Sequence, residues 1–533
     1  MSQARMGMMG SVKRIGIAAK GATIAAIALG LTACGGGGGG GIGGTGDPPS
    51  SGNKGSWTPG VFMPSGTFAA QCVNPRSGID PQTGAPYRDI SGARSDENNW
   101  VRSWMNELYL WYDEVPDLDP TFNTSTVDYF RRLLAPRDRY SFALPTDEYL
   151  QAQQAGVQID YGIQWVLFEA QPPREMRVAH VDPGTDAYAA GIRRGDALLF
   201  VDDTDFVLAN DRASVDALNA ALFAPEEGQT HSFVFRARDS GATRPATLQA
   251  ARIAYDPVPT VTVIGRPAGK TGYILFNDHN AVAEKRLIDA IAYLDAEGVT
   301  SLVLDLRYNG GGFLYIASQL AYMIAGPAQT SGRVFERLAF NDKYPPTVNP
   351  IDNSPLQPIP FFDVSTEGTN LPTLELDRVY VLTGANTCSA SESIINGLRG
   401  IGVEVIQIGA TTCGKPYGFF PTDNCGTTYL AVQFKGENDA GFGEYDFGFG
   451  PAGSTDASAE LPGCPVADDF EHELGDPLEA RLAAALAHHE GSGCPSAAAQ
   501  APVGSAKAAL PSSIDEGSMP RSPLRENRIL DWP

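Results

Sequence analysis

The chain has 533 residues, of which 43% are hydrophobic and 19% charged, a composition typical of a globular protein and not of a disordered one. At roughly 150 residues per domain, this length predicts about three or four domains. The formal net charge of −23 disfavours nucleic acids and anionic lipid headgroups as partners, because an acidic surface repels phosphates. The seven cysteines and six histidines are too dispersed for a zinc finger or ribbon, so we expect no metal and no organic cofactor.

Residues 1–33 are typical of a bacterial export signal. Basic residues up to Lys20 precede an apolar stretch, 21–31, that is too short to span a bilayer. The following Thr32-Ala33-Cys34 resembles the end of a lipobox, which implies cleavage after Ala33 and lipidation of Cys34. We therefore expect a lipid-anchored protein in the cell envelope, held at the outer membrane and facing the periplasm or the cell surface. The alternative is an ordinary secretory signal with a chance cysteine.

Two further segments have compositions that cannot bury a core. Residues 34–56 are rich in Gly, Pro and Ser and include seven consecutive glycines after Cys34, which predicts a flexible tether. Residues 491–533 are rich in Ala, Pro, Ser and Gly, which predicts a disordered tail.

Export also makes disulfides possible among the six cysteines that remain when Cys34 is lipidated. Cys413 with Cys425 is the pair that we predict, because it closes a short loop containing Pro and Gly. The other pairings stay open, since spacing alone does not decide between them.

Residues 57–153 form an N-terminal region that we expect to be mainly helical. Asp96 is predicted to cap a helix with its apolar residues spaced three and four apart on one face, namely Val101, Trp104, Leu108 and Trp111. A second helix is predicted over 127–134. This aromatic face indicates a small packed core.

Residues 157–253 are expected to be β-rich. Strands are predicted over 162–166 and 177–181, and the string 183–199 contains a short helix ending at Gly191, a turn at Gly195-Asp196 and an apolar strand. This string resembles a PDZ domain, which implies binding of an extended C-terminal peptide by strand addition. The peptide-binding residues implied are Tyr161, Gly162, Ile163 and Gln164.

Two points stay open for this region. Gln164 stands where PDZ domains usually have a second glycine, and a β-domain that only packs against its neighbour is the alternative. The end of the tail, residues 529–533, could reach the peptide groove and either inhibit the protein or be trimmed.

Residues 260–490 alternate strands with helices, which predicts an α/β layered domain. The stretch 326–376 is rich in Pro, Asn, Asp and Thr and is expected to run over one face. We predict strands over 272–276, 301–306, 378–382 and 403–408, and helices over 283–297, 313–324, 391–399 and 477–489.

Three segments of this domain indicate chemistry. The first, 304–312, is a strand that runs into Asn309-Gly310-Gly311-Gly312; no Gly-Lys-Ser or Gly-Lys-Thr follows, so a phosphate loop is unsupported. The second, 387–392, places Ser389 between a strand and a helix, where N–H groups can stabilise an oxyanion, although a serine there can simply cap the helix. The third is a loop with Lys415, which is either a buried general base or a solvated lysine.

Together, the three segments resemble the tail-specific, C-terminal processing peptidases, a serine protease family that includes tricorn-like enzymes. The resemblance covers about 95–490 and implies a multidomain α+β protein: a helical N-terminal domain, a β-rich PDZ domain and an α/β layered (crotonase/ClpP-like) protease core. It implies Ser389 as nucleophile, Lys415 as general base, and Gly311 and Ala390 as oxyanion N–H donors.

The sequence departs from the family pattern at two positions. Family members often have a Gln four residues after the lysine to orient it, and Phe419 stands there instead. Tricorn-like members use a histidine base, and Tyr140 stands where that histidine would fall, which favours Lys415. Cys388 beside Ser389 raises a thiol nucleophile as an alternative to a buried or disulfide-bonded cysteine.

The function predicted from the sequence is a serine endopeptidase that cleaves unfolded or C-terminally recognised polypeptides in the bacterial envelope through an acyl-enzyme. Its expected partners are polypeptide substrates, and its expected contact with the membrane is the lipid anchor alone. One alternative is a non-catalytic peptide-binding protein with a protease-like core. Another is a non-proteolytic α/β enzyme or small-molecule binder.

Overall fold

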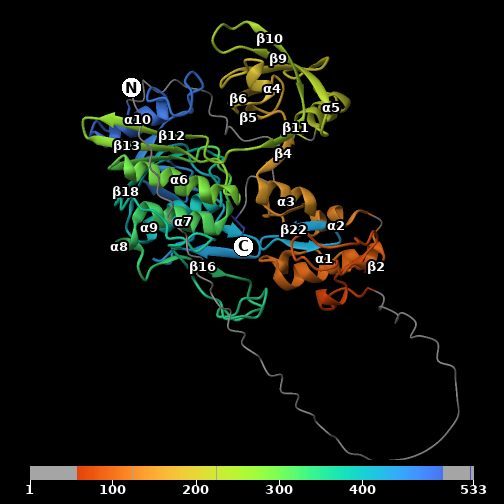
Figure 1. Ribbon diagram of the computed structural model, residues 1–533. Helices are drawn as coiled ribbons and strands as arrows, with labels where there is room; N and C mark the ends of the chain where they lie inside the picture. The colour runs from red at the N-terminus through yellow and green to blue at the C-terminus, as the bar shows by residue number, and fades with distance from the viewer. Residues whose placement is uncertain (1–56, 123, 224, 496–527, 530–533) are drawn as a thin grey trace, which may run out of the picture. The chain divides into compact units, whose positions relative to one another are not determined.

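The computed structural model describes residues 57–495 except 123 and 224, together with the backbone of residues 528–529 (Figure 1). The predicted export signal, Cys34 with its lipidation, the tether 34–56 and most of the predicted tail therefore lie outside the described residues. Among the helices that are described, none is long and apolar enough to cross a membrane.

The N-terminal region contains the helices α1 (Arg94–Leu108), α2 (Thr126–Leu133) and α3 (Thr146–Ala155). Asp96 was predicted to be the capping residue that precedes α1, but Ala93 occupies that position. Asp96 lies in the first turn of the helix, and its carboxylate accepts the Ala93 N–H at 2.9 Å. The helix ends before Trp111. Short elements complete the region: η1 (Ser65–Thr67), β1 (Gln71–Cys72), β2 (Ile90–Ser91), η2 (Tyr112–Glu114) and β3 (Phe142–Pro145).

This region is tied to the chain that follows the candidate base. β3 pairs with β22 (Thr427–Leu430), which pairs with β21 (Thr422–Asn424). Trp100 and Trp104 stack with ring centroids 5.3 Å apart, and both rings contact Tyr429 of β22. The aromatic face predicted for α1 therefore packs partly against the peptidase-like part of the chain, and not only within its own unit.

The β-rich region consists of one sheet of order β10-β9-β7-β6-β5, with β8 paired to β7, and the separate pair β4–β11. β5 lies at an edge of the sheet. Tyr161, Trp165, Phe233 and Phe235 contribute to a core of its own. The elements are β4 (Val157–Asp160), β5 (Ile163–Glu169), β6 (Glu175–Val181), α4 (Asp186–Ala189), β7 (Ala197–Val201), β8 (Thr204–Asp205), α5 (Arg212–Phe223), β9 (Thr230–Arg236), β10 (Thr243–Gln249) and β11 (Ala251–Ala254).

The central sheet of the remaining chain has the order β12-β13-β14-β18-β19-β26. β12 is antiparallel to β13, and every other neighbouring pair is parallel. Its strands are β12 (Thr260–Arg266), β13 (Gly269–Leu275), β14 (Ser301–Asp305), β18 (Arg378–Thr383), β19 (Glu404–Gly409) and β26 (Gly463–Pro465).

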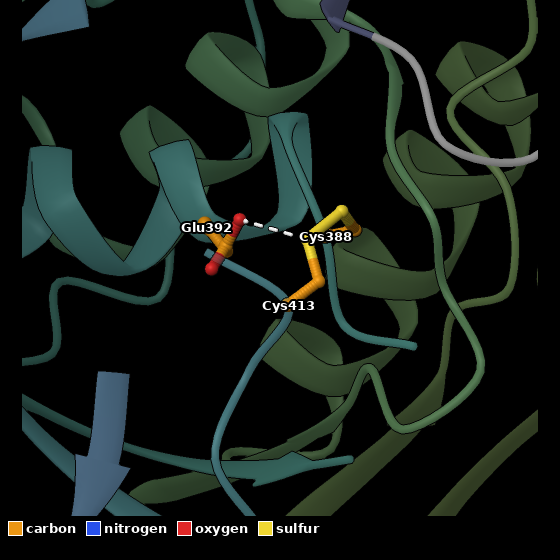
Figure 2. Close-up of side chains that lie close together, drawn as sticks. All are labelled: Cys388, Glu392 and Cys413. Atoms are coloured by element: carbon orange, nitrogen blue, oxygen red, sulfur yellow. Dashed lines mark hydrogen bonds between the residues drawn. A yellow bond between two sulfur atoms is a disulfide. The ribbon is translucent and has the colours of Figure 1, made fainter. Parts of the chain in front are cut away.

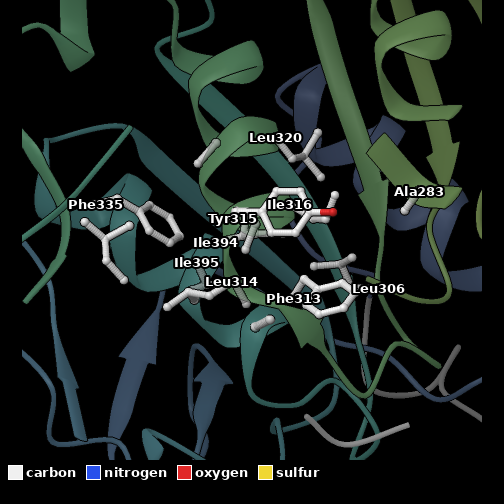
Figure 3. Close-up of a cluster of buried hydrophobic side chains, with 14 of the residues drawn as sticks. Ala283, Leu306, Phe313, Leu314, Tyr315, Ile316, Leu320, Phe335, Ile394 and Ile395 are labelled. Carbon is white, nitrogen blue, oxygen red and sulfur yellow. The ribbon is translucent and has the colours of Figure 1, made fainter. Parts of the chain in front are cut away.

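Successive side chains of a strand point to opposite faces of the sheet. Helices pack against both faces of this sheet. Leu302 and Leu304 of β14 belong to the core with α6 (Val282–Ala296), α7 (Leu314–Ala325) and α9 (Ala390–Gly400), part of which is drawn in Figure 3. Val303 belongs to the core with α10 (Ala480–His489). A strand buried on both sides reads as a continuous apolar run, as 301–306 does.

The stretch 326–376 is more structured than its composition predicts. It contains α8 (Pro327–Thr330), β16 (Val334–Ala339) and β17 (Ile359–Pro360), and β16 joins a sheet of order β17-β16-β23-β20. The other strands are β15 (Gly312–Phe313), β20 (Tyr417–Gly418), β23 (Phe434–Glu437), β24 (Phe449–Pro451), β25 (Ala459–Leu461) and β27 (Arg528–Ile529).

The described residues contain three disulfides, and the predicted pair Cys413–Cys425 is not among them. The pairs are Cys72–Cys425, Cys388–Cys413 and Cys464–Cys494. Cys425 lies at the turn between β21 and β22, which the N-terminal region covers, whereas Cys413 lies beside Ser389. The prediction was wrong because closeness in sequence does not place the two side chains on the same side of the fold.

Candidate active site

The three predicted segments follow three neighbouring parallel strands. The glycine turn follows β14, Ser389 comes after β18, and Lys415 comes after β19. Since parallel neighbours end at the same edge of a sheet, all three segments meet at the carboxyl edge, where open α/β sheets bind ligands. The strand order β14-β18-β19 thus brings together residues that are more than a hundred positions apart.

Ser389 lies in a sharp turn at the position that precedes α9. Its φ is +59°, an uncommon value for a residue other than glycine, and it directly precedes α9. Its side chain is buried, and its Oγ makes no hydrogen bond with any described residue. The hydroxyl of Ser391 instead donates to the Asn309 carbonyl at 3.0 Å. Ser389 therefore occupies the capping position of α9, and Glu392 of the first turn accepts its N–H, but the Ser389 hydroxyl forms no capping hydrogen bond with a described residue.

Glu392 connects the serine turn with the lysine loop. One of its carboxylate oxygens, Oε2, accepts the backbone N–H of Ser389 at 2.9 Å and that of Lys415 at 2.8 Å. The other, Oε1, accepts the Gly414 N–H at 2.9 Å and the Thr412 hydroxyl at 2.5 Å. Burial raises the pKa of Glu392, while these hydrogen bonds act in the opposite direction. Sequence analysis assigned no role to this glutamate.

Lys415 is fully buried, as a general base requires and a solvated lysine does not. Its Nζ lies 4.2 Å from the centre of the Phe419 ring and 5.2 Å from that of Tyr140. The Tyr140 hydroxyl also donates to the Gly414 carbonyl at 2.6 Å. Both departures from the family pattern thus lie against the same lysine, so aromatic faces occupy the positions where the family has a glutamine or a histidine.

The two predicted oxyanion donors come from different segments, one from the serine turn and one from the glycine turn. Ala390 begins α9, where the first N–H groups have no partner inside the helix. Gly311 has a φ of +105°, which favours glycine, and its N–H donates to Asn309 Oδ1 at 2.9 Å. The Gly311 N–H is therefore engaged within the glycine turn in this structure.

A disulfide lies at the centre of the site. Cys388, next to Ser389, is bonded to Cys413, two residues before Lys415, and Figure 2 shows the pair beside Glu392. The thiol-nucleophile alternative fails in this state because Cys388 has no free thiol. Cys388, Cys413 and Glu392 are close enough to suggest metal ligands, but sulfurs in a disulfide offer no thiolate to a metal.

His279 also belongs to the site, although sequence analysis assigned it no role; it contacts Asn309, which the sequence placed in the glycine turn. His279 is buried, and its ring atom Nδ1 lies 3.0 Å from Asn309 Oδ1. The backbone N–H of His279 donates to the Gly311 carbonyl at 3.1 Å. Burial lowers the pKa of His279 to about 3, so the imidazole is neutral at pH 7. Its position after β13, the strand next to β14, was the available signal.

The β-rich region contacts the glycine turn through a buried arginine. Arg194 donates to the Tyr308 hydroxyl at 2.7 Å and to Asp468 at 2.8 Å. Asp468 in turn accepts Arg307 at 2.7 Å. Arg307 and Tyr308 directly precede Asn309, so this ionic network lies immediately behind the turn that contains Gly311.

The four predicted peptide-binding residues lie at the start of β5, away from these segments, and all are buried. The Gly162 N–H donates to Asp160, and the Tyr161 hydroxyl donates to the Ala221 carbonyl at 2.9 Å. A Cβ at Gly162 would lie 2.4 Å from the side chain of Thr185, so the backbone approach there requires glycine.

Comparison with known proteins gives two matches to family models. Residues 96–142 match the Peptidase S41 N-terminal domain, and residues 270–426 match Peptidase family S41. The second match contains Gly311, Ser389, Glu392 and Lys415, which are the residues that the structure gathers at the edge of the sheet.

Two curated relatives are similar to parts of the chain. The chain is 26% identical to the carboxyl-terminal-processing protease of Picosynechococcus sp. over 288 residues, 54% of this chain and 60% of that protein. It is 24% identical to the chloroplastic C-terminal processing peptidase of Tetradesmus obliquus over 257 residues, 45% and 52% of the two chains. The chain thus spans about half the length of these curated relatives.

The fold is similar to a crystal structure described as that of an S41 protease from Bacteroides fragilis. The TM-score is 0.55 at 23% identity, and the match covers 76% of this chain and 98% of the other. Residues 96–142 and 270–426 are thus similar to the two domains of peptidase family S41, and the chain is similar to carboxyl-terminal-processing proteases.

Proposed function

We propose that the protein is a serine endopeptidase that cleaves unfolded or C-terminally recognised polypeptides in the bacterial envelope, with Ser389 as nucleophile and Lys415 as general base. The observation that supports this most is the shared carboxylate oxygen of Glu392, which holds the backbone of both residues. The match of residues 270–426 to Peptidase family S41 supports the same reaction class.

In the proposed mechanism, Lys415 takes the proton of Ser389 Oγ, which attacks the scissile carbonyl carbon. Lys415 is buried beside the serine turn, and it must hold a neutral amine to act as a base in this step. The resulting Lys415 ammonium then protonates the leaving amine. A water molecule, deprotonated by Lys415, hydrolyses the acyl-enzyme and releases Ser389.

The oxyanion is held in this proposal by the N–H groups of Ala390 and Gly311. Loss of one such donor typically costs about 10²–10³ in rate. Because the Gly311 N–H donates to Asn309 Oδ1, it must exchange this bond for the oxyanion when substrate binds. The positive φ of Gly311 gives the turn a conformation that a residue with a side chain would resist.

We further propose that the β-rich region is a PDZ domain that selects substrates by their C-terminal tails. The edge position of β5 supports this, because an exposed edge can accept an added strand. Export with a lipid anchor at Cys34 is part of the same proposal, and the three disulfides support an oxidising compartment.

One observation favours a second candidate function, a protein that holds peptides without cutting them. The Gly311 N–H is already bonded within its own turn, so one of the two proposed oxyanion donors is occupied in this state. Such a protein would bind tail peptides with equal affinity before and after Ser389→Ala and would turn none over.

The two functions are separated by a chain beginning after Cys34, incubated with an unstructured reporter that carries either an apolar or a charged C-terminal tail. We expect cleavage that depends on the tail and is lost in Ser389→Ala and Lys415→Met. Tail binding without turnover in the parent would support the second function. Turnover that ignores the tail would remove the PDZ proposal and keep the peptidase.

A further inference from the structure

The short strand β15 pairs along both of its edges. One edge pairs close to the glycine turn, and the other pairs with a segment that is distant in the sequence. On the first edge, the Phe313 N–H donates to the His279 carbonyl at 2.9 Å. On the other edge, Gly312 and Phe313 pair in parallel with Arg528 and Ile529 of β27. Gly312 directly follows Gly311, one of the proposed oxyanion donors.

β27 also lies against the lysine loop. It contacts β20, and β20 begins two residues after Lys415. The segment Arg528–Ile529 therefore lies between β15, which follows the proposed oxyanion donor, and β20, which follows the proposed base. In the proposed mechanism, the scissile carbonyl reacts between the oxyanion donor that directly precedes β15 and the base that precedes β20.

We propose that the outer edge of β15 binds extended polypeptide by strand addition, and that the chain's own segment Arg528–Ile529 occupies this edge and competes with substrate. The proposal rests on the proposed peptidase function and adds its regulation. Strand addition uses main-chain hydrogen bonds, which do not depend on side-chain identity, so an edge that accepts Arg528–Ile529 accepts other extended chains as well.

This assignment differs from the expectation that residues 529–533 would reach the PDZ-like groove. The described part of the segment pairs with β15 of the peptidase part and with no strand of the 157–253 region. The competing site is therefore the proposed catalytic edge itself.

A strand pairing of two residues is weak by itself, but here both segments belong to one chain. Segments of one chain meet at an effective concentration on the order of millimolar, so a contact with a millimolar dissociation constant is occupied about half of the time. Removing the segment should then lower the KM for an unstructured reporter by about twofold and leave kcat unchanged.

The first test measures occupancy without catalysis. Hydrogen exchange is followed at residues 312–314 in three Ser389→Ala chains: the full chain, one lacking residues 528–533, and a control lacking residues 497–502, which is shortened equally but keeps Arg528 and Ile529. We expect faster exchange only when residues 528–533 are removed. Equal exchange in all three chains, or a difference confined to residues 161–166, would overturn the proposal.

The second test restores the segment in trans. A synthetic peptide of residues 524–533 should slow exchange at residues 312–314 in the shortened Ser389→Ala chain, and in active chains it should raise the KM competitively. Absence of turnover in every chain would reject the peptidase function and leave the exchange result to decide the inference. Inhibition that lowers kcat at unchanged KM would contradict competition for the edge.

Discussion

Cys388 and Cys413 join the residue before the proposed nucleophile to a residue two positions before the proposed base. The same two segments are held a second time by the Glu392 carboxylate, through the N–H groups of Ser389 and Lys415. The relative position of nucleophile and base is therefore fixed by one covalent link and one buried hydrogen-bonded carboxylate, both of which can be removed separately.

Removal of the Cys388–Cys413 disulfide should reduce kcat, whereas removal of a comparable disulfide elsewhere should reduce only the free energy of unfolding. The matched control is Cys464–Cys494, because the two pairs are separated by 25 and 30 residues and so constrain the unfolded chain similarly. Each double alanine variant should lose about 3.5 kcal/mol of unfolding free energy by chain entropy. We expect kcat to fall only in the Cys388→Ala, Cys413→Ala variant; equal kcat in both variants would refute a positioning role.

Glu392→Gln should disrupt the link between the serine turn and the lysine loop. The carboxylate accepts hydrogen bonds from backbone N–H groups, but the amide would place its own N–H₂ group against some of them. A buried donor without an acceptor costs about 1–3 kcal/mol. We expect lower kcat, a changed pH–rate profile and lower stability. Glu479→Gln, which affects the buried ion pair with Arg307, is the control: it should lower stability and leave the shape of the pH–rate profile as in the parent.

Stability should decrease as the pH falls below 6.5, because two histidines bind protons more weakly in the folded chain. Burial lowers the pKa of His279 to about 3 and that of His180 to about 4, from 6.5 in the unfolded chain. Below pH 6.5 the unfolded state therefore binds more protons, and each histidine removes about 1.4 kcal/mol per pH unit. The raised pKa of Glu392 acts in the opposite direction near its own titration.

Chemical denaturation between pH 7 and 5 measures this slope. His279→Gln should reduce the slope by up to about 1.4 kcal/mol per pH unit, since the proton that His279 takes up on unfolding is lost. A slope that His279→Gln leaves unchanged would show that His279 is already protonated or exposed in the folded protein.

Arg194→Met should weaken the contact between the 157–253 region and the glycine turn. It removes a buried partner of Tyr308 and Asp468, and loss of one member of a buried ion pair costs about 3–5 kcal/mol. We expect a lower kcat and faster proteolytic cutting near residues 254–259. Arg238→Met is the control, because Arg238 contacts the Phe470 carbonyl at 3.1 Å and not Tyr308; a similar kcat loss there would contradict a specific coupling.

Many elements of residues 260–490 could be predicted from local pattern, whereas the catalytic roles assigned from short motifs stay predictions. The strand predicted over 301–306 is β14 (Ser301–Asp305), and the helix predicted over 283–297 is α6 (Val282–Ala296), each within a residue or two. Such patterns are local because burial on one or both faces repeats with the period of the element itself.

Contacts between distant segments were not predictable in this way. The cysteine pairing failed because it depends on where β22 and the serine turn lie in space. The role of Glu392 was missed because it is seen only once α9 and the loop after β19 are adjacent. Phe419 and Tyr140 were noted as departures, but only the structure shows that they flank the same lysine.

The most direct test of the central claim is covalent labelling of the parent protein with a serine-reactive phosphonate, followed by mass spectrometry of the peptide that contains Ser389. The account predicts one adduct on Ser389, none on that peptide in Ser389→Ala, and labelling slowed by about 10²–10⁴ in Lys415→Met, the range expected for loss of a general base. A label on another residue, or an equal labelling rate in Lys415→Met, would contradict the Ser389–Lys415 assignment.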